Sequence, residues 1–211
     1  MLDIIIVKYN NRDYENETIS QVLETLEIPY HLTVYENYER DRNLSTVWND
    51  LIRRSDADVI CLLNNDTVPA KGWIEKLLEV VKNPKVGAVG PISNRAGAHQ
   101  GGFKKAIEDK LVECTTLSGF CLVFRKEVWD KVGGFDENFK LYGEDSQFVA
   151  NIRNHGFKLI THYGVYVYHH GHKSTAIALK RGKDIESIKK ESARLFSEYV
   201  NKKHNKKVET E

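Results

Sequence analysis

Short apolar runs alternate with amphipathic segments along the first part of the chain. Residues 2–7, 31–35 and 58–63 are rich in aliphatic and β-branched side chains, which predicts three short strands. Between them, residues 18–26 and 44–54 repeat apolar side chains at helical spacing, which predicts two helices. This alternation favours an α/β fold in which parallel strands are joined by right-handed crossovers.

A further helix and strand are expected next. Pro69 and Gly72 precede an amphipathic segment at residues 73–82, and the Asn83-Pro84 pair ends it because proline cannot continue a helix. Residues 86–89 then predict another strand. The helix and strand continue the α/β pattern.

The second half of the chain is less regular. Residues 94–105 hold three glycines and few apolar side chains, which predicts a loop. The other expected elements are a strand at 117–124, a helix at 145–154, a strand or hairpin at 158–169 and an amphipathic helix at 176–199.

Composition narrows the class of protein. The chain has 211 residues, 41% hydrophobic and 29% charged, and its net charge is +1, so no overall field attracts nucleic acid. The three cysteines show no CxxC spacing, and no apolar run reaches the roughly 18 residues of a membrane span. A signal-peptide layout is absent as well. We therefore expect a cytoplasmic location.

Polar side chains follow three of the expected strands. The apolar run at 59–63 ends in Asn64-Asn65-Asp66-Thr67, the first strand ends in Lys8-Tyr9-Asn10-Asn11, and the second ends in Glu36-Asn37. Ligands of open α/β sheets bind at the carboxyl ends of the strands, so these groups are candidates for one binding site. Simple turns are the alternative, since Asn, Asp and Thr are common turn formers.

Two more polar clusters lie later in the chain. Glu144 and Asp145 precede a helical pattern, where acids are also favoured by the helix dipole alone. His169, His170 and His172 follow a β-prone run. Because neighbouring strand residues point to opposite faces, at most one of these histidines is expected to face a given site, and surface histidines are the alternative.

The sequence after the first strand lacks the phosphate-binding loops of several classes of nucleotide enzyme. It continues into Lys8-Tyr9-Asn10 rather than into the glycine-rich turn of a dinucleotide-binding enzyme, and no Walker A sequence occurs. The basic, glycine-rich loop that sugar nucleotidyltransferases carry after this strand is also missing.

The clusters, taken in order, resemble the inverting family 2 glycosyltransferases with the GT-A fold, close to their rhamnosyltransferase-like members. The resemblance covers residues 2–174. The matching segments are Leu63-Asn64-Asn65-Asp66-Thr67, Gly72-Trp73, Val86 to Pro91, Ser118 to Arg125, Gly133-Gly134-Phe135-Asp136-Glu137, Glu144-Asp145 and His169 to Ser174.

The resemblance implies a fold and an activity. The fold would be the GT-A nucleotide-diphospho-sugar transferase fold, with a mixed, mostly parallel central sheet flanked by helices. Residues 1–174 would form the catalytic domain, and residues 175–211 a C-terminal amphipathic helix with a basic tail. The activity would be metal-dependent, inverting transfer of a sugar from a UDP- or dTDP-sugar to a hydroxyl of a glycan, glycolipid or glycoprotein. Nucleic acid is not an expected partner.

The resemblance also assigns residues. Asp66 and His169 would bind Mn²⁺ or Mg²⁺, and Asp145, beside Glu144, would be the catalytic base. Separately from the resemblance, the glycine content of the loop at 95–103 suggests that it closes over the donor. The expected donor-binding residues are Val7, Tyr9, Asn10, Glu36, Asn64, Asn65, Asn94, Ser118 and Gly119.

Departures from the family pattern keep a second function open. Gln147 stands where many relatives have an acid, Asn64 replaces the first acid of the usual metal motif, and Ser45 replaces a glycine. Glu36 is one methylene longer than the usual Asp. The alternative is therefore a catalytically inactive nucleotide-sugar or glycan-binding module. The basic residues 202–207 suggest a peripheral membrane contact, against the alternative of a solvated tail.

Overall fold

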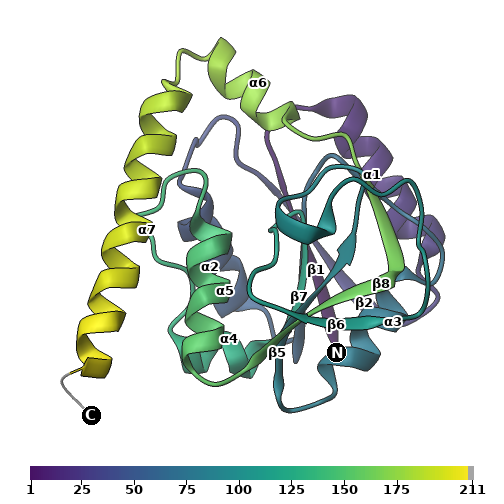
Figure 1. Cartoon of the computed structure of the whole chain (residues 1–211). Coiled ribbons are helices and arrows are strands. Elements are labelled where there is room, and N and C mark those ends of the chain that lie inside the picture. The colour runs from purple at the N-terminus through teal and green to yellow at the C-terminus, as the bar shows by residue number, and fades with distance from the viewer. Residues whose placement is uncertain (209–211) are drawn as a thin grey trace.

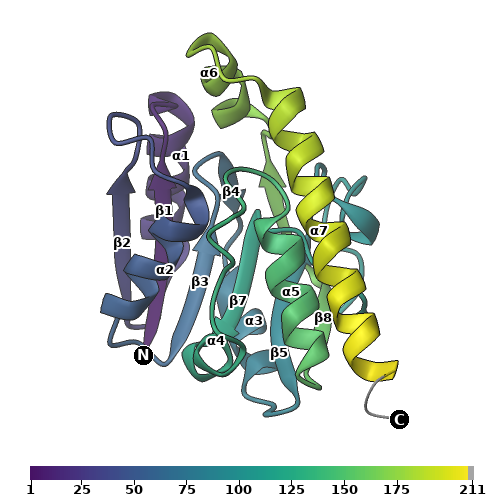
Figure 2. The ribbon, with the colours of Figure 1, turned by 90° about the vertical axis from the view of Figure 1, so that its left-hand side faces the viewer.

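One sheet with helices on both faces forms the molecule (Figures 1 and 2). The structure is a computed structural model that describes residues 1–208, without the side chains of Ala98 and of residues 203–208. The strands are β1 (Leu2–Lys8), β2 (Tyr30–Glu36), β3 (Val59–Leu63), β4 (Thr67–Pro69), β5 (Val86–Ile92), β6 (Leu111–Cys114), β7 (Cys121–Arg125) and β8 (Lys158–His169). The helices are α1 (Arg12–Thr25), α2 (Leu44–Arg54), α3 (Trp73–Val81), α4 (Lys126–Val132), α5 (Glu144–Asn154), α6 (Lys173–Lys180) and α7 (Ile185–Val208), with one 3₁₀ turn, η1 (Ala98–Gln100).

The sheet is mixed and mostly parallel, as the sequence predicts. Its strand order is β2-β1-β3-β7-β5-β8-β4, and β6 pairs with β8. β1 runs parallel to β2 and β3, and β5 runs parallel to β8, whereas β7 is antiparallel to both β3 and β5. The reversed β7 brings the loop before it to the carboxyl end of β3, which is where the polar cluster lies.

Several element boundaries differ from the expected ones. The strand expected at 117–124 begins only at Cys121, and α1 begins at Arg12 rather than at residue 18. The short β4, β6 and α4 were not predicted from the pattern. The expected helix at 176–199 is two helices, because the chain turns at Gly182, whose φ is +80°. Ser174, after which a domain boundary was predicted, lies in α6, and the division into two domains stays a prediction.

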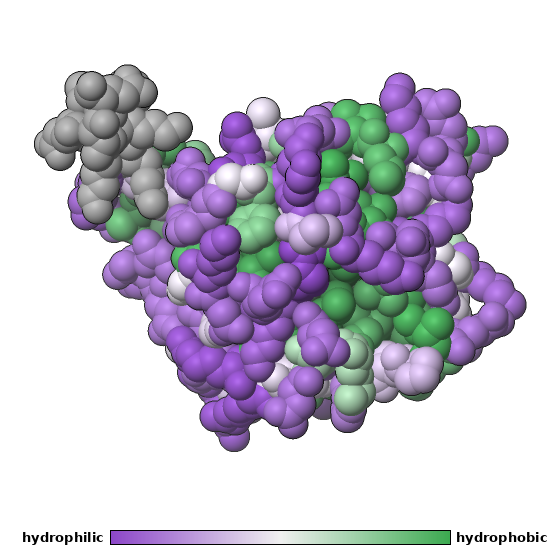
Figure 3. Space-filling model, turned by 90° about the horizontal axis from the view of Figure 1, so that it is seen from below, coloured by the Kyte–Doolittle hydropathy of each residue, from purple (hydrophilic) through white to green (hydrophobic). Residues whose placement is uncertain are grey.

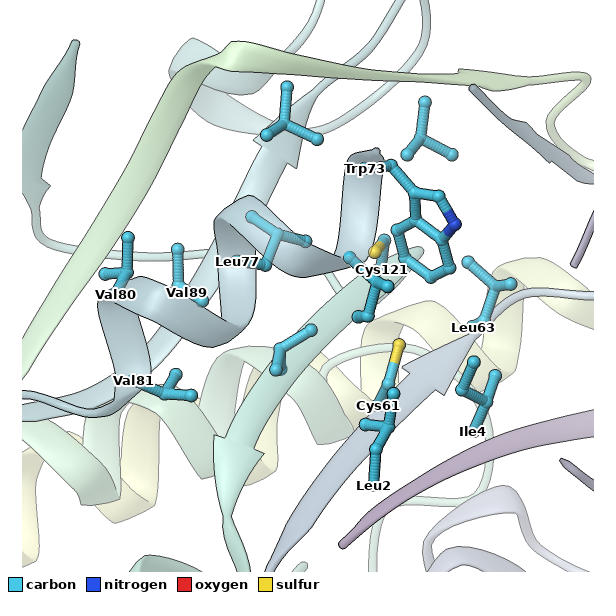
Figure 4. Close-up of a cluster of buried hydrophobic side chains, with 14 of the residues drawn as sticks. Leu2, Ile4, Cys61, Leu63, Trp73, Leu77, Val80, Val81, Val89 and Cys121 are labelled. Carbon is cyan, nitrogen blue, oxygen red and sulfur yellow. The ribbon is translucent and has the colours of Figure 1, made fainter. Parts of the chain in front are cut away.

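The core lies in two layers, one on each face of the sheet. On one face, α1 and α3 cover β1, β3 and β7, with Trp73 and Leu77 packed over Cys61 and Cys121 (Figure 4). On the other face, α2, α4 and α5 pack through an aromatic cluster that includes Phe148. Burying a large apolar side chain contributes roughly 1.5–3 kcal/mol, so both layers hold the strands firmly. Their carboxyl ends are therefore a fixed platform.

Cys61, Cys114 and Cys121 are all free thiols. Among residues 1–208, every helix is too short or too polar to cross a bilayer. The end of the molecule opposite the carboxyl ends of β1 and β3 shows hydrophobic residues in its centre, surrounded by hydrophilic ones (Figure 3).

Candidate active site

A cavity of about 760 Å³ is lined by residues at the carboxyl ends of β1 and β3 and by residues of α6. The ribbon shows α6 above these strand ends (Figure 2). This volume falls in the range of small-molecule and cofactor sites, roughly 300–1,000 Å³. Segments from both halves of the chain line it. The sequence-predicted residues in its lining are Val7, Tyr9, Asn64, Asn65, Asp66, Ser118, Gly119, Glu144, Asp145 and His169.

Three predicted donor-binding residues do not line this cavity. Asn10 is exposed. The half-exposed Glu36 carboxylate instead lies 3.4 Å from Lys8 Nζ, because the end of β2 turns it outward. Asn94 acts on the backbone of His169: its Oδ1 accepts the His169 N–H at 2.8 Å, and its Nδ2 donates to the His169 carbonyl at 3.1 Å. Asn94 thus supports a lining residue instead of facing the cavity.

Asp66 and His169 meet although 103 residues separate them in the chain. β4 pairs with β8 in a register that places Thr67 opposite His169. This pairing brings Asp66, which directly precedes Thr67, next to the His169 side chain. The distance from His169 Nε2 to Asp66 Oδ1 is 3.1 Å. Phe120 stacks on the imidazole with ring centroids 5.4 Å apart, which fixes the ring plane.

The hydrogen bonds of His169 define the state of its ring. Nδ1 lies 2.8 Å from the Arg95 carbonyl oxygen, which only accepts, so Nδ1 carries the proton. In the neutral ring, Nε2 then presents a lone pair to the Asp66 carboxylate. Two acceptors at this distance need a positive charge between them, either a proton on Nε2 or a metal ion.

This pair fits a divalent metal. Metal-binding histidines usually donate their other N–H to a carbonyl or carboxylate, as His169 does to Arg95. The 3.1 Å separation suits two ligands of one ion, since small divalent ions bind oxygen and nitrogen at about 2.1 Å. Within residues 1–208, no group of three or more His, Cys, Asp or Glu side chains forms a complete metal cage.

The charge of Asp66 is maintained despite its burial. Burial raises the pKa of the Asp66 carboxyl group, but the hydrogen bond and charge of His169, together with the Lys173 backbone N–H, outweigh this effect and lower it. An ionised carboxylate is the form that binds a cation.

Two residues of α1 that the sequence did not single out support the polar strand ends. The buried Glu15 accepts hydrogen bonds from the Tyr9 N–H at 2.7 Å, from the Asn11 N–H at 2.9 Å and from Asn65 Nδ2 at 3.0 Å. Thr18 exchanges two hydrogen bonds with the backbone of Thr67. In the sequence, Glu15 lies in a strongly polar helical turn and was therefore indistinguishable from a solvent-exposed residue.

Asp145 lies in the first turn of α5, where the helix dipole favours an anion. Its Oδ2 accepts the Gly119 N–H at 2.7 Å, and its Oδ1 accepts the Ser146 N–H at 2.7 Å. A Cβ at residue 119 would come within 3.0 Å of Asp145, so only glycine allows this approach. Gln147, in place of the usual acid, is buried, and its side-chain oxygen accepts the Asp136 N–H at 3.4 Å outside the cavity.

The loop before β7 is fixed by a buried glutamine. Gln100 accepts the Ser118 N–H at 2.7 Å and donates to the Pro91 carbonyl at 2.7 Å. Backbone hydrogen bonds join Ser93 to both Gln100 and Phe103. The segment expected to close over the donor is thus tied to the sheet at both ends, and Gln100 holds the Ser118-Gly119 backbone beside Asp145.

Glu144 is buried next to Asp145 and is incompletely bonded. It is 7% exposed, and its Oε2 has no hydrogen-bond partner among the described residues. Burial, and next the charge of Asp145, raise the pKa of Glu144 to about 8. The carboxyl group is therefore largely protonated at neutral pH.

Replacing Glu144 by glutamine should change how stability depends on pH. The folded state binds the Glu144 proton more tightly than the unfolded state, whose pKa is 4.5, so wild-type stability falls as pH rises from about 4.5 to 8. Glu144→Gln removes this loss and should be more stable than wild type at pH 9 by roughly 3–5 kcal/mol. Thermal unfolding at pH 5 and pH 9 measures the difference, with the exposed Glu39→Gln as control. Identical pH profiles for wild type and Glu144→Gln would contradict the assignment.

Another group of residues closes the far end of the cavity. Asp41, with φ +46°, accepts a hydrogen bond from the Tyr9 hydroxyl at 2.5 Å and from Lys183 Nζ at 2.6 Å. Burial raises the pKa of Asp41, but Lys183 and Tyr9 outweigh this effect and lower it. Asn37 holds the turn through hydrogen bonds with the Arg42 backbone. The sequence indicated a polar end of β2 but not which acid faces the cavity.

The sequence matches a family model and resembles several known proteins. Residues 2–183 match the family model "Glycosyltransferase like family 2". The O-antigen biosynthesis protein RfbC of Myxococcus xanthus is 25% identical over 61% of the chain, and the uncharacterized protein Rv1525 of Mycobacterium tuberculosis is 30% identical over 53% of it. The aligned regions are 12% and 46% of the lengths of these two relatives.

Solved structures share the fold at low sequence identity. The mannosyltransferase PcManGT of Pyrobaculum calidifontis, in complex with GDP-Man and Mn²⁺, aligns with a TM-score of 0.64 and 17% identity over 92% of this chain and 64% of its own. GalNAc-T7, with UDP, GalNAc and Mn²⁺, aligns with a TM-score of 0.65 and 13% identity over 80% of this chain and 43% of its own. The expected GT-A fold is confirmed. By its fold and by the match over residues 2–183, the chain belongs to the glycosyltransferase family 2-like proteins.

Proposed function

We propose that this chain is a metal-dependent, inverting hexosyltransferase that moves a sugar from a UDP- or dTDP-sugar to a hydroxyl of a glycan, glycolipid or glycoprotein. The observation that carries the proposal is that Asp66, His169 and Asp145 line one cavity, with Asp66 and His169 in contact. Because its motifs resemble those of rhamnosyltransferase-like members, we further propose that the chain belongs to that subgroup.

The cavity offers two ends to a nucleotide-sugar donor. Val7, Tyr9 and Asp41 at one end supply an apolar wall, an aromatic ring and an anionic acceptor, which suit a nucleoside. Asp66 and His169 also line the cavity and would hold the metal. A nitrogen ligand among oxygens favours manganese slightly over magnesium, and the bound ion supplies positive charge for the departing diphosphate.

Asp145 would accept the proton of the acceptor hydroxyl. As that oxygen forms its bond to the anomeric carbon, the bond from this carbon to the diphosphate oxygen breaks, and the proton passes to an Asp145 carboxylate oxygen. A single in-line displacement inverts the configuration at the anomeric carbon. The hydrogen bonds from Gly119 and Ser146 orient the carboxylate for this task.

A donor panel tests the proposal. UDP-, dTDP- and GDP-sugars are incubated with the protein in the presence of Mn²⁺, and release of the nucleoside diphosphate is measured with and without EDTA. We expect metal-dependent release from a UDP- or dTDP-sugar. Binding of nucleotide with no release from any donor would favour the alternative, an inactive nucleotide-sugar-binding module. Release that EDTA does not reduce would contradict metal dependence.

The basic tail is the part of the proposal furthest from the cavity. Residues 202–207 would contact an anionic membrane surface that carries lipid-linked acceptors. The side chains of residues 203–207 lie outside the part of the chain that the structure describes.

A further inference from the structure

The turn that leads into α5 has an unusual backbone. Tyr142 has φ +69° and Gly143 has φ +84°, so two consecutive residues lie in the left-handed region. Glycine adopts this conformation readily, but tyrosine does so only when its surroundings hold it there. Glu144 and Asp145 follow directly. The position of both acids therefore depends on what holds Tyr142.

Two helices from the C-terminal part of the chain hold this turn. The Tyr142 hydroxyl lies 2.6 Å from Thr175 Oγ1 of α6. Ser192 of α7 is buried, and its hydroxyl donates to the Leu141 carbonyl at 3.1 Å. The Ser192 Cβ lies 3.5 Å from the position that a Cβ on Gly143 would occupy, so α7 packs directly against the turn.

α7 is also fastened to the C-terminal end of α5. It lies alongside α5 in both ribbon views (Figures 1 and 2). The Tyr199 hydroxyl donates to Asn151 Oδ1 at 3.1 Å and accepts from Asn154 Nδ2 at 2.9 Å. Ser192 and Tyr199 are seven residues apart, two helical turns, so both fall on the face of α7 toward α5. The position of α7 along α5 is thus fixed by contacts near both ends of α5.

Of these elements, only α7 lies outside the segment that matches the family model. The family match ends at residue 183, and α7 begins at Ile185. A helix that served only to cover apolar surface would need no buried hydroxyl directed at the backbone of an active-site turn. Ser192 supplies that hydroxyl, and it satisfies a carbonyl of a turn that the preceding helices leave open.

We propose that Ser192 of α7, together with the Tyr142–Thr175 hydrogen bond, positions Asp145 for proton transfer, so that α7 is a working part of the active site. The proposal rests on the function proposed above. Ser192 does not line the cavity and acts only through the Leu141–Gly143 turn, which makes it a positioning residue. Nucleotide binding, at the opposite end of the cavity, should not depend on it.

The test uses Ser192→Ala, at a residue outside the cavity lining, and the double variant with Tyr142→Phe, which also removes the hydroxyl of a lining residue. Ser197→Ala, an exposed serine of the same helix, is the matched control. With the donor found in the panel, kcat of the double variant should fall about 10- to 100-fold, because small misplacements of catalytic groups cost this much. The Kd for UDP with Mn²⁺ and the KM for donor should stay within twofold. Ser192→Thr keeps the hydroxyl, so its kcat should be close to that of wild type and higher than that of Ser192→Ala.

A second measurement tests the positioning role of Ser192 without any enzyme assay. Amide hydrogen exchange at residues 141–146 should accelerate in the double variant and not in Ser197→Ala, whether or not the protein transfers sugar. Unchanged exchange, or unchanged kcat in the double variant, would overturn the positioning role. A parallel loss of kcat and UDP affinity would overturn it too, because it would indicate general loss of structure. Wild type that binds no nucleotide would instead count against the proposed function.

Discussion

Asp145→Asn is expected to lower the rate of sugar transfer about 10²- to 10⁴-fold, the range that a general base contributes. Asparagine keeps the shape of the side chain, and its single amide oxygen can still accept one of the two N–H groups, from Gly119 or from Ser146. It cannot take the proton of the acceptor hydroxyl. Nucleotide binding should survive, because Tyr9 and Asp41 at the other end of the cavity are untouched. Steady-state kinetics and titration calorimetry with UDP and Mn²⁺ measure the two effects.

The matched control for this variant is Asp130→Asn, an exposed acid on α4. It should transfer sugar at the wild-type rate. If Asp145→Asn were as active as this control, Asp145 would not be the base, and the neighbouring Glu144, with its pKa of about 8, would become the acid to test.

Asp66→Asn is expected to weaken Mn²⁺-dependent nucleotide binding by about 100-fold or more. Even residues that only orient metal ligands change metal affinity 10- to 100-fold, and here a direct ligand would lose its charge. His169→Gln should have a similar effect, because it removes the nitrogen that lies 3.1 Å from the Asp66 carboxylate. Calorimetric titration of UDP with and without Mn²⁺ measures the difference.

His31→Gln, on the exposed edge strand β2, serves as the control for the metal variants. Its Mn²⁺ dependence should equal that of wild type. If Asp66→Asn bound UDP as tightly as wild type with Mn²⁺ present, the metal would have to lie elsewhere.

The fold was predictable because its core strands are continuous apolar runs. β1 and β3 appear in the sequence within two residues of their observed ends, and the strands were expected to be parallel. β7 could not be oriented from sequence, since an apolar pentapeptide reads the same in either direction of the sheet. The break between α6 and α7 depends on one residue, Gly182, inside a continuous amphipathic pattern.

Part of the candidate site was predictable because some of its residues directly follow or begin predictable elements. Asp66, Asp145 and His169 lie at the ends of elements, where motifs and periodicity are informative. Glu36 and Asp41 show the limit: both are acids after β2, and only the turn held by Asn37 determines which one faces the cavity.

The supporting contacts of Glu15 and Ser192 with distant segments were not visible in the sequence. Glu15 lies in a polar helix and yet is fully buried, because three donors from two strand ends converge on it. Ser192 is one of several serines on a charged helix, and only the packing of α7 against α5 distinguishes it. Such residues depend on tertiary position and not on any local pattern.

Anomalous diffraction from a crystal soaked with Mn²⁺ and UDP tests the central claim most directly. We predict one manganese peak within bonding distance of an Asp66 oxygen and of His169 Nε2, with the diphosphate on the ion, the uracil toward Tyr9 and Asp41, and Asp145 facing the open part of the cavity. A manganese ion bound away from both Asp66 and His169, with UDP outside this cavity, would contradict it.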